Sequence, residues 1–89
     1  MQRKTIAIPN KLGLHARAAA KFVQIASGFP CEVKIAKGTR EVNGKSIMGV
    51  MMLAAGQGVL IDIIVEGEEE VLALAELEKL VSNRFGEDE

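Results

Sequence analysis

His15 is the only histidine in the chain of 89 residues, and it lies between a glycine loop and a segment rich in helix formers. The loop is Lys11–Leu14, and the alanine-rich segment begins at Ala16. This pattern predicts an imidazole at or near the N-cap of a helix, where backbone N–H groups lack partners and the helix dipole is positive. A phosphoryl group on His15 would be stabilised there.

Arg17 adds a permanent cation two residues after His15, and its forked guanidinium can bind phosphate oxygens. A neutral imidazole is a good nucleophile near pH 7. Phosphoryl transfer depends mainly on positioning and charge stabilisation, to which the backbone N–H groups of Ala16 and Ala18 can contribute. The spacing also fits a simpler interpretation, in which His15 only caps a helix and Arg17 is a solvated charge.

Ser46 precedes a short apolar segment, residues 47–53, and is expected to be its N-cap. One short helix cannot bury Ile47, Met48, Met51 and Met52 on a single face, so we expect some of them in the core and the rest exposed near Ser46. The exposed ones would form an apolar docking patch for transient partners. Its other predicted members, several of them basic, are Leu14, Ala16, Arg17, Ala20, Lys21 and Lys45.

Alternation of apolar and polar residues predicts four strands, at Thr5–Ile8, Cys31–Lys37, Arg40–Asn43 and Val59–Val65. Helical spacing predicts three helices, at about residues 16–27, at 47–53 and from residue 68 onward. The order β-α-β-β-α-β-α indicates an α+β fold with helices on one face of the sheet and the other face exposed to water.

The last predicted helix begins at three consecutive glutamates, which favour the positive end of its dipole. Its expected core stripe is Val71, Leu74, Leu77 or Glu78, and Leu80 or Val81. The tail, residues 86–89, is expected to be frayed and to lie far from His15.

Composition and length limit the classes of protein to which the chain can belong. With 48% apolar and 26% charged residues, the chain is typical of one folded domain, residues 1–89. So small a domain has little room for an enclosed cavity, which disfavours a self-contained metabolic enzyme.

The net charge of −1 hides a strong division. Residues 1–46 carry nine Lys or Arg and two Glu, whereas residues 47–89 carry two basic and ten acidic residues. If the halves do not interleave, the division predicts a basic and an acidic face. The basic residues neither run together nor alternate with aromatics, which disfavours nucleic-acid binding.

Cys31 is the only cysteine, which excludes an internal disulfide, a cysteine-rich zinc site and a dithiol redox motif. We interpret it as a small hydrophobic residue at a strand start. We expect no signal peptide, no membrane-spanning stretch and no metal or organic cofactor, so the cytoplasm is the expected location.

Two segments closely resemble the signatures of a known family. They are residues 10–17, Asn-Lys-Leu-Gly-Leu-His-Ala-Arg, and residues 43–53, Asn-Gly-Lys-Ser-Ile-Met-Gly-Val-Met-Met-Leu. Both are similar to segments of HPr, the histidine-containing phosphocarrier protein of the bacterial phosphoenolpyruvate-dependent phosphotransferase system. The resemblance covers essentially the whole chain.

The resemblance implies an open-faced β-sandwich in which His15 accepts a phosphoryl group from Enzyme I on Nδ1 and passes it to a IIA protein or domain. By the same match, Arg17 would bind the phosphate. The family usually has proline where this chain has Ala18, which restores a backbone N–H near the phosphate. We hypothesise that this N–H is an additional donor.

In this family, a serine at the position of Ser46 is phosphorylated by an HPr kinase/phosphorylase in species that possess it. Phosphoserine there would repel acidic partners that dock beside His15, with the fold unchanged.

Two alternatives stay open. The chain could belong to the nitrogen-related HPr branch, which feeds a regulatory IIA protein and which the acidic C-terminus favours. It could also be a small binding regulator that is never phosphorylated. A monomer is expected, because the recognition surface must stay free.

Overall fold

The secondary structure follows the order predicted from the sequence, with one short helix added at the end. The computed structural model describes all 89 residues. Its elements are β1 (Gln2–Ala7), α1 (Ala16–Ala26), β2 (Glu32–Lys37), β3 (Arg40–Asn43), α2 (Ile47–Met52), β4 (Leu60–Glu66), α3 (Glu70–Ser82) and the 3₁₀ helix η1 (Arg84–Gly86).

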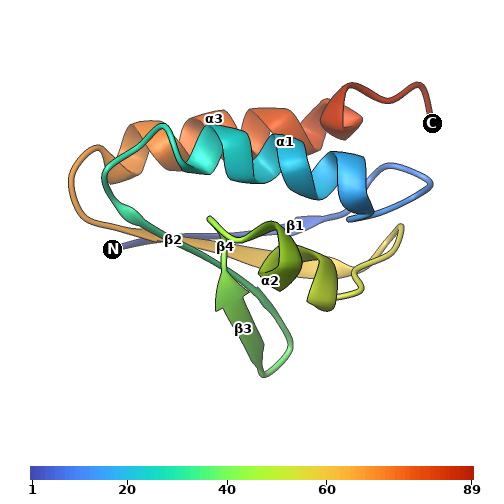
Figure 1. Cartoon of the computed structure of the whole chain (residues 1–89), viewed down its shortest axis with the longest axis horizontal. Coiled ribbons are helices and arrows are strands. Elements are labelled where there is room, and N and C mark those ends of the chain that lie inside the picture. The colour runs from blue at the N-terminus through green and yellow to red at the C-terminus, as the bar shows by residue number, and fades with distance from the viewer.

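The four strands form one antiparallel sheet in the order β1-β4-β2-β3. The β-branched strand β4 lies in the interior of the sheet, with Ile63 opposite Lys4 of β1 and Ile35 of β2. Helices α1 and α3 lie side by side over one face of the sheet (Figure 1). The predicted α+β architecture, an open-faced sandwich, is therefore confirmed.

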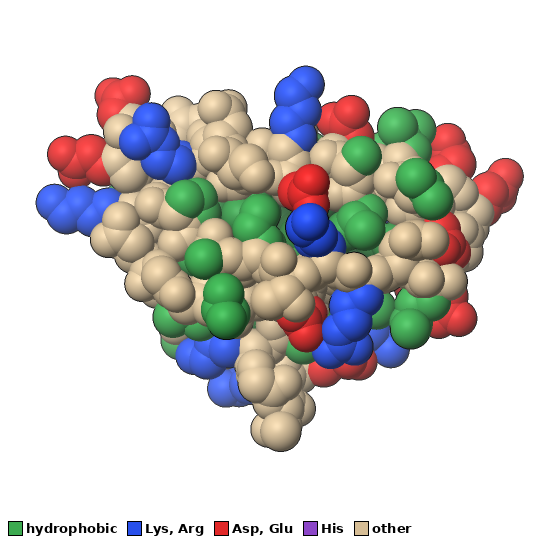
Figure 2. Space-filling model, turned by 180° about the vertical axis from the view of Figure 1, so that it is seen from behind, with side chains coloured by type: hydrophobic (Ala, Val, Ile, Leu, Met, Phe, Trp, Pro, Cys, Tyr) green, Lys and Arg blue, Asp and Glu red, His purple; other side chains and the backbone are tan.

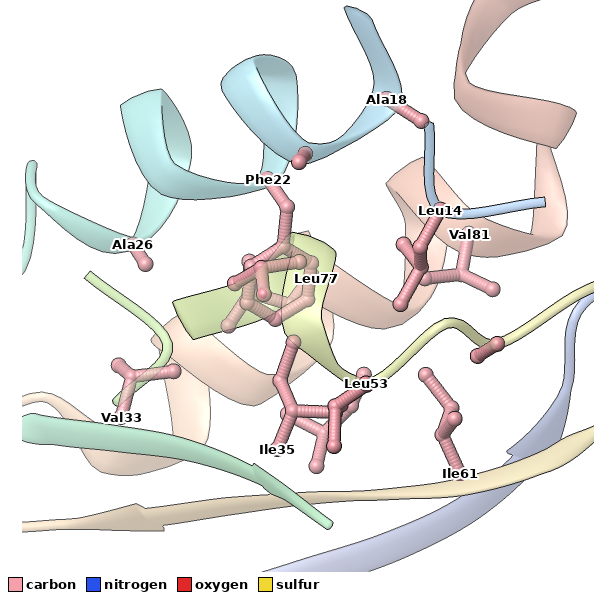
Figure 3. Close-up of a cluster of buried hydrophobic side chains, with 14 of the residues drawn as sticks. Leu14, Ala18, Phe22, Ala26, Val33, Ile35, Leu53, Ile61, Leu77 and Val81 are labelled. Carbon is pink, nitrogen blue, oxygen red and sulfur yellow. The ribbon is translucent and has the colours of Figure 1, made fainter. Parts of the chain in front are cut away.

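The core lies between the helices and the covered face of the sheet. Phe22 of α1 and Leu77 of α3 are fully buried and point toward Ile35 of β2, with Leu53 beside them (Figure 3). Burying an aliphatic or aromatic side chain of this size contributes about 1.5–3 kcal/mol, so these contacts hold α1 in place over the sheet.

The predicted core stripe of α3 is partly wrong. Its fully buried residues are Ala73, Leu77 and Val81, at a spacing of four, whereas Val71 is 66% exposed. Leu74 and Leu80 flank this stripe and are half-buried. Hydropathy favoured the larger side chains, but packing placed the small Ala73 on the inner face.

The division of charge along the chain does not become two separate faces. Strand β1 from the basic half pairs with β4 from the acidic half, and Arg3 binds Asp62 at 2.8 Å across this pairing. Lys4 likewise pairs with Glu78 of α3 at 3.5 Å. Figure 2 shows acidic and basic side chains intermingled on the face seen from behind Figure 1. Antiparallel pairing interleaves the halves, so the condition under which a basic and an acidic face were expected is not met.

Candidate functional site

His15 occupies the N-cap of α1, with an extended backbone (φ −77°, ψ 179°) and a side chain that is 26% exposed. The first helical bond runs from the N–H of Ala19 to the carbonyl of His15 at 2.8 Å. The N–H groups of Ala16, Arg17 and Ala18 therefore have no acceptor within the chain. Ala16 and Arg17 are exposed, so their N–H groups at the positive end of this eleven-residue helix form an anion-binding position beside the imidazole, whereas Ala18 is fully buried.

The glycine loop before His15 is held by a neighbouring loop. Leu14 donates its N–H to the carbonyl of Ala55 at 2.9 Å. Gly13 has φ +67°, and a Cβ at this position would lie 2.4 Å from the same carbonyl oxygen. Only glycine fits here, because the close approach and the left-handed backbone both exclude a side chain. The contact fixes the point at which the chain enters α1 and thereby the position of His15.

The C-terminal tail lies against His15, and our expectation that it is frayed and distant is wrong. Phe85 is fully buried, and Lys21 donates through Nζ to the carbonyl of Phe85 at 2.7 Å. The N–H of Lys11 donates to the main-chain oxygen of Glu89 at 3.0 Å. Burial of one aromatic side chain near the end of the chain thus outweighs the polar composition of the last residues.

Glu87 of this tail contacts the imidazole directly. Its Oε2 is hydrogen-bonded to Nε2 of His15, and its Oε1 accepts a hydrogen bond from Nδ2 of Asn10 at 2.9 Å. Burial raises the pKa of the Glu87 carboxyl, but bonds from Asn10 and His15 and the charge of Arg17 outweigh this effect and hold that pKa below its ordinary value. The group is therefore ionised near neutral pH and can accept a hydrogen bond from Nε2–H of His15. A neutral ring that donates this bond has a free lone pair on Nδ1.

An open hollow of about 520 Å³ lies beside this site, lined by Lys11, Arg17, Lys21 and the tail. Arg17 is exposed and forms no hydrogen bond or ion pair. Its guanidinium is therefore available to an anion that enters the hollow.

Sequence reasoning missed two residues of this site, Glu87 and Asn10. Asn10 is fully buried, and its Nδ2 donates to both Glu87 and the carbonyl of Gly13, each at 2.9 Å. The only local signals are an asparagine beside a proline, at Asn10, and the acidic end of the chain, which includes Glu87. Neither signal indicates the contact between His15 and Glu87, which are 72 positions apart.

Ser46 caps α2 as predicted, because its Oγ accepts from the N–H of Gly49 at 3.1 Å. All four large apolar residues of α2 are exposed, which contradicts the expectation that some belong to the core. The exposed fractions are 43% for Ile47, 71% for Met48, 38% for Met51 and 55% for Met52. In this six-residue helix the only fully buried position is Val50.

The remaining members of the predicted patch divide into two groups. Ala16 and Arg17 are exposed and Ala20 is half-buried, so all three reach the surface. Leu14 is only 5% exposed and belongs to the core, so its side chain cannot be a surface anchor. The Lys21 and Lys45 ammonium groups bind the carbonyls of Phe85 and Phe29, each at 2.7 Å, and are not free rim charges.

A family model described as the PTS HPr component phosphorylation site matches residues 2–83. The chain belongs to the HPr family. Among curated relatives, phosphocarrier protein HPr of Pseudomonas aeruginosa is 55% identical over 85 residues, covering 94% of each chain. Phosphocarrier protein HPr of Neisseria meningitidis is 51% identical over 89 residues and covers both chains fully.

Solved HPr structures have the same fold. HPr-C-His from Thermoanaerobacter tengcongensis matches with a TM-score of 0.96 and 45% identity over the full length of both chains. An HPr dimer from the same organism matches with a TM-score of 0.78 and 46% identity, covering 98% of this chain and all of that one. The family is therefore one of phosphocarriers of the phosphotransferase system, and at least one relative forms dimers.

No group of three or more His, Cys, Asp or Glu side chains lies close enough to hold a metal ion. None of the chain's helices has both the length and the apolar character needed to cross a bilayer.

Proposed function

We propose that this chain is a phosphocarrier that accepts a phosphoryl group from phosphorylated Enzyme I on Nδ1 of His15 and passes it to a IIA protein or domain. The observation that carries the proposal is the position of His15, beside three unpaired N–H groups and with Nε2 bonded to Glu87. This arrangement leaves Nδ1 as the nucleophilic nitrogen and supplies donors for the transferred group.

In this proposal, the transfer of the phosphoryl group needs no further catalytic group. The Nδ1 lone pair attacks phosphorus, and the bond to the donor breaks with its electron pair returning to Enzyme I. Nε2 keeps its proton, so the phosphorylated ring carries a positive charge next to the Glu87 carboxylate. Arg17 and the N–H groups of Ala16 and Ala18 would bind the phosphoryl oxygens. The chain thus acts as a substrate of the protein that donates the phosphoryl group and of the protein that receives it.

The test is incubation with phosphoenolpyruvate and Enzyme I. We expect acid-labile phosphate on the wild-type chain and none on His15→Ala, with a phosphorus NMR signal typical of Nδ1-phosphohistidine. A chain that acquires no acid-labile phosphate would instead be a binding regulator. Transfer onward only to a regulatory IIA protein would identify the nitrogen-related branch.

We also propose that Ser46 is a regulatory phosphorylation site for an HPr kinase/phosphorylase. Ser46 is half-buried at the start of α2, directly before the exposed side chains of Ile47 and Met48. A phosphoryl dianion there would place negative charge on the apolar docking surface and repel an acidic partner. Addition of ATP and the kinase should give acid-stable phosphate on wild type and none on Ser46→Ala.

The proposed docking surface is now Ala16, Arg17, Ala20, Ile47, Met48 and Met51, without Leu14. Helices α1 and α2 pack against each other, so these residues lie on adjoining elements. Exposed methionines adapt to more than one partner, as a carrier requires. We propose that the chain acts as a monomer with this surface free, and sedimentation velocity at working concentration tests this.

A further inference from the structure

A group of contacts connects the C-terminal tail to the imidazole. Glu87 is an acidic residue close to the chain end, yet its side chain is only 10% exposed. Both carboxylate oxygens are occupied, Oε1 by Asn10 and Oε2 by His15. A carboxylate held at two points has a defined orientation toward the ring, unlike a mobile surface charge.

Asn10 determines how Glu87 is held. Its amide is fully buried, and its Nδ2 donates to the carbonyl of Gly13 and to Glu87, whereas its Oδ1 has no partner. Because both neighbours are acceptors, only the NH₂ group can face them. The two N–H donors of the Asn10 amide therefore connect the loop before His15 to the carboxylate of Glu87.

The backbone of the tail is shaped to bring Glu87 to the ring. Arg84, Phe85 and Gly86 all have left-handed φ values, 56°, 54° and 77°. Two consecutive non-glycine residues in this region are strained and persist only where surrounding contacts maintain them. Here the maintaining contacts are the burial of Phe85 and the bond from Lys21 to its carbonyl, so the turn that follows α3 is set independently of Glu87.

We infer that Glu87 is a positioning residue for phosphoryl transfer, and that Asn10 holds it in place. The inference rests on the proposed function, in which His15 is the acceptor. The carboxylate at Nε2 selects the Nε2–H tautomer and so presents the Nδ1 lone pair to the donor. After transfer it stabilises the positive charge on the phosphorylated ring, as a carboxylate does for an imidazolium in a hydrolase triad.

The first experiment measures the tautomer of the unphosphorylated protein. His15 is the only histidine, so the full chain with ¹⁵N-labelled histidine gives one pair of ring signals. At a pH where the ring is neutral, we expect the Nε2–H form to dominate in wild type. In Glu87→Ala the ratio of Nε2–H to Nδ1–H should fall roughly tenfold, the effect expected for loss of a charge-assisted hydrogen bond. Glu87→Gln keeps the shape and an acceptor oxygen and should give an intermediate ratio.

The matched control is Asp88→Asn, which removes one negative charge from the adjacent position, where the side chain has no hydrogen bond or ion pair. Its tautomer ratio should equal that of wild type. An unchanged ratio in both Glu87 variants, or an equal fall in Asp88→Asn, would overturn the inference.

The second experiment measures phosphorylation by Enzyme I. In Glu87→Ala we expect the maximal rate to fall about tenfold and KM to stay within about twofold, because the ring is altered and the docking surface is not. A rise in KM with an unchanged maximal rate would show that Glu87 serves docking and would overturn the inference. If wild type itself accepts no phosphate, the proposed function fails, whereas the tautomer result still decides what Glu87 does to the ring.

Discussion

His15 and Glu87 are 72 positions apart in the chain, yet a carboxylate oxygen of Glu87 is bonded to Nε2 of the His15 imidazole. The contact gives the two ring nitrogens different environments. Nε2 faces a carboxylate that is mostly buried, and Nδ1 has no partner within the chain. Because Nε2 is occupied by the carboxylate, only Nδ1 is placed to attack a phosphoryl group.

The first prediction concerns the N–H of Ala18, where other family members usually have proline. This N–H has no acceptor within the chain although Ala18 is fully buried, and we expect it to donate to a phosphoryl oxygen once His15 is phosphorylated. Ala18→Pro should therefore shorten the lifetime of phospho-His15 severalfold, measured as loss of acid-labile phosphate. Ala18→Gly keeps the N–H and serves as the control. Equal lifetimes for wild type and Ala18→Pro would show that the N–H contributes nothing.

The second prediction concerns pH and Glu87. The pKa of Glu87 is below its ordinary value in the folded chain, because Asn10, His15 and Arg17 outweigh burial. The carboxylate therefore adds stability that is fully present above the ordinary glutamate pKa of about 4.3 and is lost as pH falls through the lower folded-state pKa. Glu87→Gln should be less stable than wild type at about pH 7, and the difference should narrow toward about pH 3.

Urea unfolding at both pH values measures this difference in free energy of unfolding. Asp62 and Glu70 also have lowered pKa values, Asp62 through bonds from Thr5 and Arg3 and Glu70 through the N–H of Gly67, and they contribute equally to both proteins. Asp88→Asn is the control and should follow the wild-type pH profile. A constant gap between wild type and Glu87→Gln at both pH values would contradict the prediction.

The third prediction concerns the loop that positions His15. Gly13→Ala combines a left-handed φ of +67° with a Cβ 2.4 Å from the Ala55 carbonyl oxygen, and we expect it to reduce stability by about 2–4 kcal/mol. Gly38→Ala is matched to it, since Gly38 has φ +61° but no atom within 4 Å of its Cβ position. That control should lose only about 1–2 kcal/mol. Chemical denaturation measures both, and equal losses would mean that the contact with Ala55 is unimportant.

The fourth prediction separates capping from charge at Ser46. Ser46→Ala removes the bond to the N–H of Gly49 and should lower stability by about 1 kcal/mol, with little effect on transfer. Ser46→Asp keeps a capping oxygen and adds a charge, so it should raise KM for Enzyme I without loss of stability. Ser46→Asn, a neutral cap of similar shape, should transfer as wild type does. If Ser46→Asp had the wild-type KM, the electrostatic explanation would be wrong.

The fifth prediction concerns the exposed apolar surface of α2. Met48→Gln should raise KM for Enzyme I severalfold and leave stability within about 0.5 kcal/mol, because the side chain is 71% exposed. Leu72→Gln removes a residue of α3 that is 51% exposed and serves as the control. Steady-state phosphorylation and denaturation are measured on both variants. A larger effect from Leu72→Gln would place the docking surface on α3.

Local patterns determined most of the secondary structure and the place of His15 within it. The alternation in β2, the alanine-rich start of α1 and the serine before α2 depend on neighbours within a few residues, which the sequence displays directly. For the same reason His15 was correctly expected at the N-cap of α1 and Ser46 at the N-cap of α2.

Only the tertiary structure decided which residues surround the imidazole and which side chains remain available to a partner. Burial of Phe85 brings the tail back to α1, so that Glu87 reaches His15 and Lys21 is engaged by a carbonyl. The same packing draws Leu14 into the core and leaves the methionines of α2 outside it. These outcomes depend on contacts between segments far apart in the chain and on the close fit of the core, which short-range periodicity does not encode.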